Sequence, residues 1–214
     1  MKNRRSTVLM AAGTLLLLGA LSLTALNLWN EKNAEFQSEQ ARAALAEVIP
    51  HYAPAEIKNV ITASAAPLPD VLTATAEPTE TMATVMQDVK IKEQDYIGIL
   101  DIPVLNLSLP ILENWNYTFL KVSPCRYAGS YLDDSMIIAA HNYKRHFGLL
   151  RELQNGDCVV FTDVTGAAYT YQVTDIETLA GTAAGEMLAG DWDLTLFTCT
   201  PGGASRVVVR CKRV

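Results

Sequence analysis

The N-terminal part of the chain is restricted to a helix by a run of 25 uncharged residues, Ser6 to Asn30. Leu, Ala, Val, Met and Gly dominate this run, which ends at the amphipathic Trp29. At a rise of about 1.5 Å per residue, such a helix is roughly 37 Å long. This length exceeds the ~30 Å hydrocarbon core of a bilayer. We therefore expect residues 6–30 to span a membrane once.

A cleaved signal peptide is the alternative for this segment, because basic residues followed by an apolar run also begin such peptides. Their apolar region is only about 7 to 15 residues long. The run in this chain is longer and is followed by no clear Ala-x-Ala cleavage site, which favours an uncleaved anchor. The basic residues Lys2, Arg4 and Arg5 predict that residues 1–5 are a cytoplasmic tail. Everything from Glu31 onward then lies outside the cell membrane.

The charge balance argues against a nucleic-acid partner. The chain has 23 acidic residues, and 14 of its 17 basic residues lie beyond the apolar run, so the exported part has a net charge of −9. Nucleic-acid-binding domains usually have a basic surface. The four cysteines are few and widely separated, which is not typical of a disulfide scaffold, and no Cys-x-x-Cys pair indicates a zinc site.

Residues 31–91 are predicted to connect the membrane to a folded domain. From Glu31 to Tyr52 a partly helical apolar pattern ends at Pro50, which indicates a short stalk helix; a partner-binding helix is the alternative. From Ala53 to about Met86 the sequence is rich in Ala, Thr, Pro, Ser and Glu. This composition is typical of an extended linker.

Residues 92–214 are enough for one domain with one core. Short apolar runs separated by Gly, Pro, Asn and Asp predict a mainly β fold, a sandwich or a barrel. The expected strands are Tyr96 to Leu100, Leu105 to Leu112, Ser135 to Ala140, Cys158 to Thr162, Ala168 to Ile176, Asp193 to Thr198 and Arg206 to Lys212. A helical spacing of Phe147, Leu150 and Leu153 predicts one short helix, and a weaker second helix is predicted over Ala183 to Leu188.

The strongest chemical signal lies near the C-terminus. Cys199 ends an apolar strand and Arg206 begins the next one, with Thr200-Pro-Gly-Gly-Ala-Ser205 as a tight turn between them. Both side chains should therefore flank the mouth of one hairpin. A guanidinium near a thiol favours the nucleophilic thiolate.

The same hairpin argues against a disulfide between Cys199 and Cys211. If residue 199 faces residue 206, then residue 211 faces residue 194, about 17 Å away at about 3.3 Å per residue. Cys125 and Cys158 are expected to be buried small hydrophobic residues.

His141 is the candidate proton carrier, because it ends the apolar run Met136 to Ala140 and can face a cleft. A thiol beside an imidazole is the minimum apparatus for acyl transfer. His146 lies five residues further on, where a solvated or capping role is expected, and His51 belongs to the stalk.

These segments together resemble the sortases, the membrane-anchored cysteine transpeptidases of Gram-positive bacteria. The resemblance covers about residues 94 to 214. It rests on Ser135-Met-Ile-Ile-Ala-Ala-His-Asn142, Phe147-Gly-Leu-Leu-Arg-Glu-Leu153, Asn155-Gly-Asp157, Thr195-Leu-Phe-Thr-Cys199, and Arg206 followed by Val207-Val-Val-Arg210. It implies an eight-stranded β-barrel with one or two short helices, in which His141 and Cys199 end neighbouring strands and Arg206 lies on the next one.

By the same resemblance, Cys199 attacks the carbonyl after Thr in an LPxTG-like sorting signal and forms a thioacyl enzyme. An amine of a cell-wall precursor or of a pilin lysine then releases the surface protein. His141 acts as general acid and then base, Arg206 binds substrate and favours charge on the oxyanion, and Thr198 helps to shape the site. The resemblance implies no cofactor. The acidic residues Asp133, Asp134 and Glu177 give no reason to assign a metal, because surface acids are common.

The short connection from Glu177 to Asp193 argues against a class B type, which has a long helical insertion there. No Asp-Pro-Trp or Asp-Pro-Phe lid motif precedes the barrel and no second apolar span follows Val214, which argues against the pilin-polymerising type. A class A, D or E-like enzyme is expected. Two other functions stay open: an L,D-type cell-wall transpeptidase, whose Ser-His-Gly-Cys run is missing, and a non-catalytic tethered barrel that binds sorted proteins or wall components.

Overall fold

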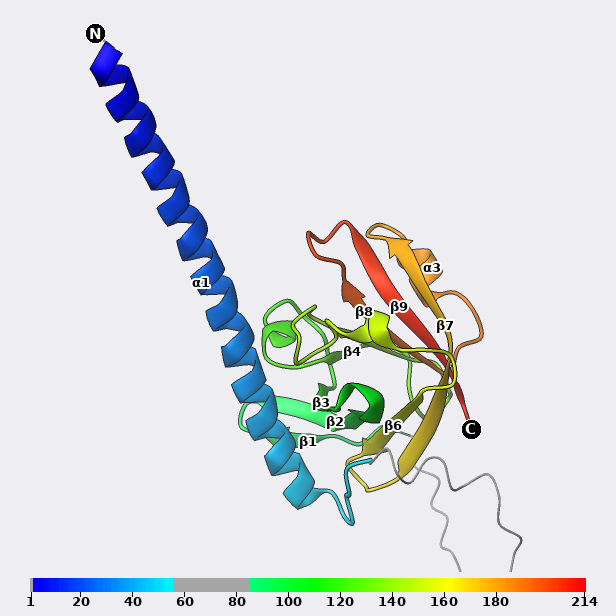
Figure 1. The fold of residues 1–214 in the computed structure, drawn as a ribbon. Helices are drawn as coiled ribbons and strands as arrows, with labels where there is room; N and C mark the ends of the chain where they lie inside the picture. The colour runs from blue at the N-terminus through cyan, green and yellow to red at the C-terminus, as the bar shows by residue number, and fades with distance from the viewer. Residues whose placement is uncertain (1, 56–84) are drawn as a thin grey trace, which may run out of the picture.

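The computed structural model describes residues 2–55 and 85–214. Helix α1 runs without interruption from Lys2 to Val48, and its N-terminal half projects away from the folded domain (Figure 1). The predicted linker falls largely on residues 56–84, which lie outside the described residues. The division into residues 1–5, 6–30, 31–91 and 92–214 stays a prediction.

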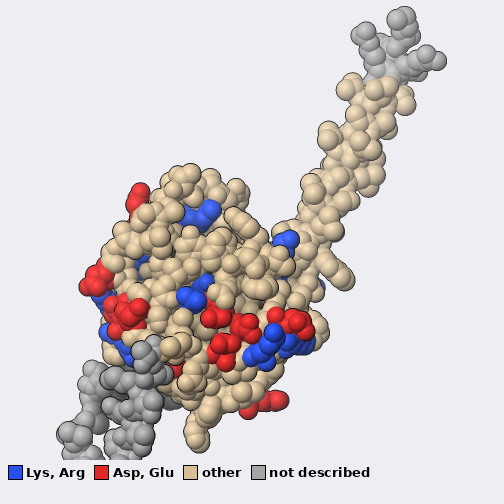
Figure 2. Space-filling model, turned by 180° about the vertical axis from the view of Figure 1, so that it is seen from behind, with Lys and Arg blue, Asp and Glu red and all other residues tan. Residues whose placement is uncertain are grey.

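The apolar half of α1 is consistent with a membrane anchor. Among the described residues, α1 is the helix that is long and apolar enough to cross a bilayer; its most apolar part has a mean hydropathy of 2.0 and none of that part is buried. Figure 2 shows that the projecting part of α1 bears no coloured charged side chains, as expected from the uncharged run between Arg5 and Glu31.

The described part of the chain forms nine strands in one sheet, and eight of them close into a barrel. The strand order is β1-β2-β3-β4-β5-β8-β9-β7-β6, and β2 also pairs with β6, which closes the barrel and leaves β1 as an extra strand on β2. The strands are β1 (Val89–Ile91), β2 (Gln94–Ile102), β3 (Leu107–Leu112), β4 (Cys125–Ala128), β5 (Met136–Ala140), β6 (Cys158–Asp163), β7 (Ala168–Ala180), β8 (Leu194–Cys199) and β9 (Ser205–Arg213).

The period of two along each strand separates the barrel interior from its outer face. Along β8, Leu194 and Leu196 pack in the main core, whereas Phe197 packs in a separate cluster with Leu179, Met187 and Val208. The barrel is thus filled by one set of apolar side chains. The other set lies outside the sheet, where loops and helices cover it. The mainly β, eight-stranded fold implied by the resemblance is confirmed.

The second half of α1 packs on the barrel. The residues Ala34, Ser38, Ala41, Leu45 and Ile49 are buried at helical spacing, and α1 contacts β1, β2 and β3. Beyond the helix, the Tyr52 hydroxyl is 3.2 Å from both carboxylate oxygens of Asp101 and 3.0 Å from the Ser108 hydroxyl. The stalk segment therefore lies against the domain along its whole helical length.

Several local expectations differ from the structure. Strands β1 and β4 were not predicted, because both are short. The helix predicted over Phe147 to Leu153 is wrong: the segment consists of turns and the 3-10 helix Leu150–Glu152. The prediction over Ala183 to Leu188 is confirmed by α3, Ala184–Leu188. The remaining short helices are the 3-10 turns Pro103–Leu105 and Phe119–Lys121.

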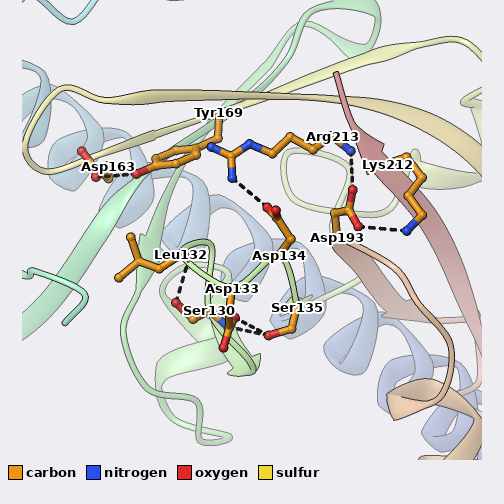
Figure 3. A network of polar contacts seen from close by, with 10 residues as sticks. All are labelled: Ser130, Leu132, Asp133, Asp134, Ser135, Asp163, Tyr169, Asp193, Lys212 and Arg213. Carbon is orange, nitrogen blue, oxygen red and sulfur yellow. Dashed lines mark hydrogen bonds and ion pairs between the residues drawn. The ribbon is translucent and has the colours of Figure 1, made fainter. Parts of the chain in front are cut away.

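A polar network fixes the C-terminal end of β9 at one end of the barrel (Figure 3). Arg213 pairs with Asp134 at 2.8 Å, and its guanidinium lies 4.6 Å from the centre of the Tyr169 ring. Asp193 accepts the backbone N–H of Arg213 at 2.7 Å and pairs with Lys212 at 3.0 Å. These contacts connect β9 to the segments that lead into β5 and β8. They hold the starts of the two strands whose other ends carry His141 and Cys199.

Candidate active site

The three predicted side chains lie at the ends of adjacent strands. Strand β5 runs parallel to β8, with Ala140 opposite Thr198, so His141 follows directly beside Cys199. Strand β8 pairs antiparallel with β9, and Cys199 is opposite Arg206. Neighbouring strands are about 4.8 Å apart. The fold therefore brings together three residues that are separated by up to 65 positions in the sequence.

The same side of the sheet presents all three groups. His141 follows Ala139 at a spacing of two, Cys199 follows Phe197, and Arg206 precedes Val208, and these neighbours lie outside the main core. His141, Cys199 and Arg206 are each half-buried and line one groove of about 270 Å³. The predicted meeting of thiol, imidazole and guanidinium in one cleft is thus present in the structure.

The hairpin between Cys199 and Arg206 depends on its turn residues. Gly202 and Gly203 both have positive φ, 85° and 76°, a conformation that glycine adopts without steric cost. The Thr200 N–H donates to Ser205 O at 2.9 Å, and the Gly203 N–H donates to Thr200 O at 2.8 Å. The turn thereby fixes the register in which Cys199 faces Arg206.

Arg206 is held by its own turn and keeps further donors for another group. Its Nη1 donates to the carbonyl oxygens of Gly203 and Ser205, both at 3.0 Å. Within the described part of the chain, the recorded bonds of this guanidinium involve Nη1 only. The planar fork retains Nε and Nη2 for a ligand oxygen.

Thr198 lies on the other face of β8. It is buried, and its hydroxyl donates to the carbonyl oxygen of Ala140 at 2.9 Å. This bond ties β8 to β5 directly before Cys199 and His141. Thr198 is not among the residues that line the groove, so its effect on the site would act through the position of the two strands.

The environment of His141 favours a neutral imidazole. Burial lowers the pKa of His141, and the nearby cation of Lys121 lowers it further. The Tyr143 ring lies against the imidazole, with 4.9 Å between ring centres and an angle of 35° between the planes. A neutral imidazole can accept a proton from a thiol.

The position of His146 differs from the one expected from the sequence. It is fully buried rather than solvated or capping. Neither ring nitrogen has a hydrogen-bond partner within residues 2–55 and 85–214. Burial, followed by the proximity of His141, lowers the pKa of His146 to about 4. The segment that carries it folds inward beneath Tyr143, whose ring centre is 5.6 Å from that of His146.

The groove has an aromatic wall that was not predicted from the sequence. Trp115 and Tyr117 come from the loop between β3 and β4, and their rings pack edge to face at 5.6 Å. Trp115 then contacts Tyr127, and Tyr127 contacts Phe197, each at 5.2 Å. The spacing of two between Trp115 and Tyr117 in a polar loop was the available signal.

The opposite wall is formed by the connection between β7 and β8, which includes Ala183, Ala184 and Met187. Arg210 holds this connection in place through hydrogen bonds and one ion pair. It donates to the carbonyl oxygens of Met187 and Glu186 at 2.9 Å, to the Thr195 hydroxyl at 3.1 Å, and pairs with Glu177 at 2.8 Å. Arg210 is only 3% exposed, and its bonds to Met187 O and to the Thr195 hydroxyl are buried. The groove consequently has two apolar walls and a reactive end.

The other cysteines are separate from this site. All four cysteines, which lie in the described part of the chain, are free. Cys211 faces Leu194, as predicted, so it is remote from Cys199 in the hairpin. Burial raises the pKa of Cys125 and Cys211 to about 12 and also raises that of Cys158. Cys125 is buried as expected, whereas Cys158 is half-buried.

Comparison with solved structures gives matches to several sortases. Sortase C from Streptococcus pneumoniae is 25% identical with a TM-score of 0.51, over 58% of this chain and 70% of that chain. Sortase C from Clostridium perfringens, solved with the C-terminal cell wall sorting motif, is 26% identical with a TM-score of 0.50, over 58% and 73%. Sortase A from Corynebacterium diphtheriae has a TM-score of 0.52 at 22% identity, over 57% and 62%, so this chain spans less than two thirds of it.

No curated protein matches the chain significantly. The structural matches include both A and C types and so do not assign a subtype. The family model for the sortase domain matches residues 100–214, which include His141, Cys199 and Arg206. Because this match covers more than half of the chain, the protein belongs to the sortase family.

Proposed function

We propose that this sortase transpeptidase cleaves an LPxTG-like sorting signal through a thioacyl intermediate on Cys199 and transfers the acyl part, which ends in the signal's Thr, to an amine. The observation that carries the proposal is the shared groove of Cys199, His141 and Arg206 at the ends of three adjacent strands. Family membership and the sortase C solved with a sorting motif support the same chemistry.

In the first half of the reaction, His141 takes the thiol proton of Cys199, and the sulfur attacks the backbone carbonyl carbon of the signal's Thr. The carbonyl oxygen takes up negative charge, and the free donors of Arg206 are suited to stabilise it. The tetrahedral intermediate then expels the amine of the next residue, which takes a proton from His141. The C–N bond is broken, and the substrate remains bound through a thioester.

In the second half, an amine of a cell-wall precursor or of a pilin lysine attacks the thioester. His141 takes the proton of the attacking amine, and the C–S bond breaks. The leaving thiolate of Cys199 then takes that proton from His141, which restores the starting thiol and neutral imidazole. No oxidant or reductant takes part. The two apolar walls of the groove suit an extended peptide with apolar side chains. The same walls shield the thioester from water. The sorted protein is thereby attached covalently to its acceptor.

The same proposal places the chain in the membrane. Residues 1–5 form the cytoplasmic tail, residues 6–30 the span, residues 31–91 the connection and residues 92–214 the catalytic domain outside the cell. The basic residues that precede the apolar run favour this direction of insertion. The partners would be surface proteins that carry a sorting signal, together with the amine acceptor.

Peptide trapping tests this function. The full chain in detergent is incubated with a small library of LPxTG-like and NPxTN-like peptides, with and without an added amine, and examined by mass spectrometry. We expect a thioacyl adduct on Cys199 that the amine converts to a transfer product. Cys158→Ala is the matched control, because Cys158 is also a half-buried thiol, and it should leave the adduct unchanged. A folded chain that binds peptides without forming any adduct would instead be a binding module.

A further inference from the structure

The part of α1 that directly follows the apolar run contacts the loop that follows His141. Glu31 Oε1 accepts the backbone N–H of Lys144 at 2.8 Å, and Glu35 Oε1 pairs with Arg145 Nε at 3.0 Å. Glu31 is the first charged residue after the apolar run, and Glu35 lies one helical turn further on the same face. These two carboxylates reach residues that are more than 100 positions away in the sequence.

The loop contacted by α1 is compact and contains Tyr143. The N–H groups of His146 and Gly148 both donate to the carbonyl oxygen of Tyr143 at 2.9 Å, and the Phe147 N–H donates to His141 O at 3.2 Å. A side chain at Gly148 would collide with the backbone, because its Cβ would lie 2.6 Å from Asn142 O. The loop therefore has little freedom to rearrange locally while its two ends are held.

Tyr143 transmits the position of this loop to the imidazole. Its ring contacts those of both His141 and His146, with ring centres 4.9 Å and 5.6 Å away. Burial raises the pKa of Tyr143, and the nearby negative charge of Glu31 raises it further. A movement of the loop away from α1 would thus remove the ring that covers His141.

We infer that Glu31 and Glu35 are positioning residues for His141: they hold the loop 142–146 against α1, so that Tyr143 keeps the imidazole in place beside Cys199. The inference rests on the proposed function, because it concerns the proton carrier of that reaction. The helix that anchors the protein thereby also orders one of its reactive groups. Catalytic efficiency depends steeply on such placement, and a displacement of about 1 Å can cost about 10²-fold in rate.

The decisive variant is Glu31→Ala/Glu35→Ala in the full chain in detergent. Loss of both contacts should lower kcat about 10-fold while the KM for peptide stays within about two-fold, since the groove walls are untouched. Glu39→Ala is the matched control: it lies one turn further along α1 and bonds Arg42 of the same helix, and it should behave as the parent. A kcat equal to that of Glu39→Ala would overturn the inference.

A charge exchange tests the contact itself. Glu35→Arg should lower kcat, and the combination Glu35→Arg/Arg145→Glu should restore most of the loss by forming the reversed pair. Failure of the exchange to recover any activity, with both variants folded, would contradict a role for this contact. Glu31→Gln should retain more activity than Glu31→Ala, because its amide oxygen can still accept the Lys144 N–H.

Titration of His141 followed by NMR gives a readout that does not require turnover. The groups around His141 that carry or can take charge are Lys121, Tyr143, His146, Cys199 and Arg206, and none of them is substituted. If Tyr143 no longer covers the imidazole, the pKa of His141 should rise toward its ordinary value. An unchanged His141 titration in the double variant would overturn the inference. A shifted titration in a chain without transfer activity would overturn only the proposed function.

Discussion

The two ends of the barrel use polar side chains in opposite ways. At the end where β9 finishes, Arg213, Lys212, Asp134 and Asp193 are bonded to one another and Arg213 also covers Tyr169 (Figure 3). At the other end, Arg206 bonds through Nη1 alone among the residues that the structure describes. Both ends belong to the same strands, so the sheet supports a closed network at one end and an open site at the other.

This difference follows from what each end has to do. A polar group that stabilises a fold is best paired within the protein, since an unpaired buried group costs free energy. A catalytic group must instead gain interactions as charge develops on the substrate. The free donors of Arg206 and the accessible thiol of Cys199 fit the second requirement. The comparison predicts large effects on turnover at the groove and small effects on stability at the network.

The largest effect should come from Cys199→Ala. Removal of the nucleophile should lower turnover by at least about 10³-fold, without loss of fold, because this side chain is only half-buried. Product formation followed by chromatography, together with circular dichroism of the variant, checks both parts. Retention of transfer in Cys199→Ala would place the nucleophile elsewhere and would show that the groove is not the reactive end of the barrel.

Arg206→Lys should have the second-largest effect. Lysine keeps the charge but lacks the planar fork that can engage two oxygens while Nη1 holds the turn. We expect a loss of about 10²-fold in kcat/KM, which is typical for the removal of one oxyanion donor. Steady-state kinetics with the preferred peptide measures it. Turnover near that of the parent would mean that a positive charge at position 206 is enough for catalysis and that the planar guanidinium is not required.

His146 belongs to neither pattern, because it lies close to the groove, is buried, and has no hydrogen-bond partner in the described part of the chain. Its pKa is lowered from 6.5 to about 4 by burial and by His141. Above pH 6.5 the imidazole is neutral in both states, so stability is unaffected. As the pH falls from 6.5 toward 4, only the unfolded chain takes up the proton. The folded state is therefore destabilised progressively.

We expect about 3 kcal/mol of this acid destabilisation, at about 1.4 kcal/mol per pH unit. His146→Phe keeps a ring beside Tyr143 and removes the titrating group. Urea unfolding at several pH values between 7 and 4 should show a smaller loss of stability in this variant than in the parent. Identical pH dependence of the two proteins would show that His146 is solvated.

The smallest effect should come from Asp134→Asn in the C-terminal network. The Arg213–Asp134 pair is 36% and 42% exposed, and exposed pairs contribute about 0 to 1 kcal/mol. Turnover should be unchanged because the pair is at the far end of β5 and β9. Thermal unfolding and peptide transfer measured on the same sample test this. A marked loss of activity would show that the two ends are coupled.

Much of the catalytic end could be predicted because its determinants are local. A strand ending at Cys199, a turn with two glycines and a returning strand at Arg206 fix their own register. The helix predicted at Phe147 was wrong because three leucine or phenylalanine residues at helical spacing also fit a compact turn that packs into the core. The expected exposure of His146 was wrong because nothing in its sequence neighbours indicates which way such a turn folds.

The apolar span, most strands and the pairing of Cys199 with Arg206 follow from the sequence, since period and turn chemistry act between residues close along the chain. The aromatic wall of Trp115 and Tyr117, the burial of His146 and the packing of α1 on the barrel follow from the three-dimensional arrangement. They depend on contacts between distant parts of the chain; in the contact of α1 with the loop after His141, for example, Glu35 and Arg145 are 110 positions apart. Such contacts form only after the barrel closes, because closure decides which loops share a face.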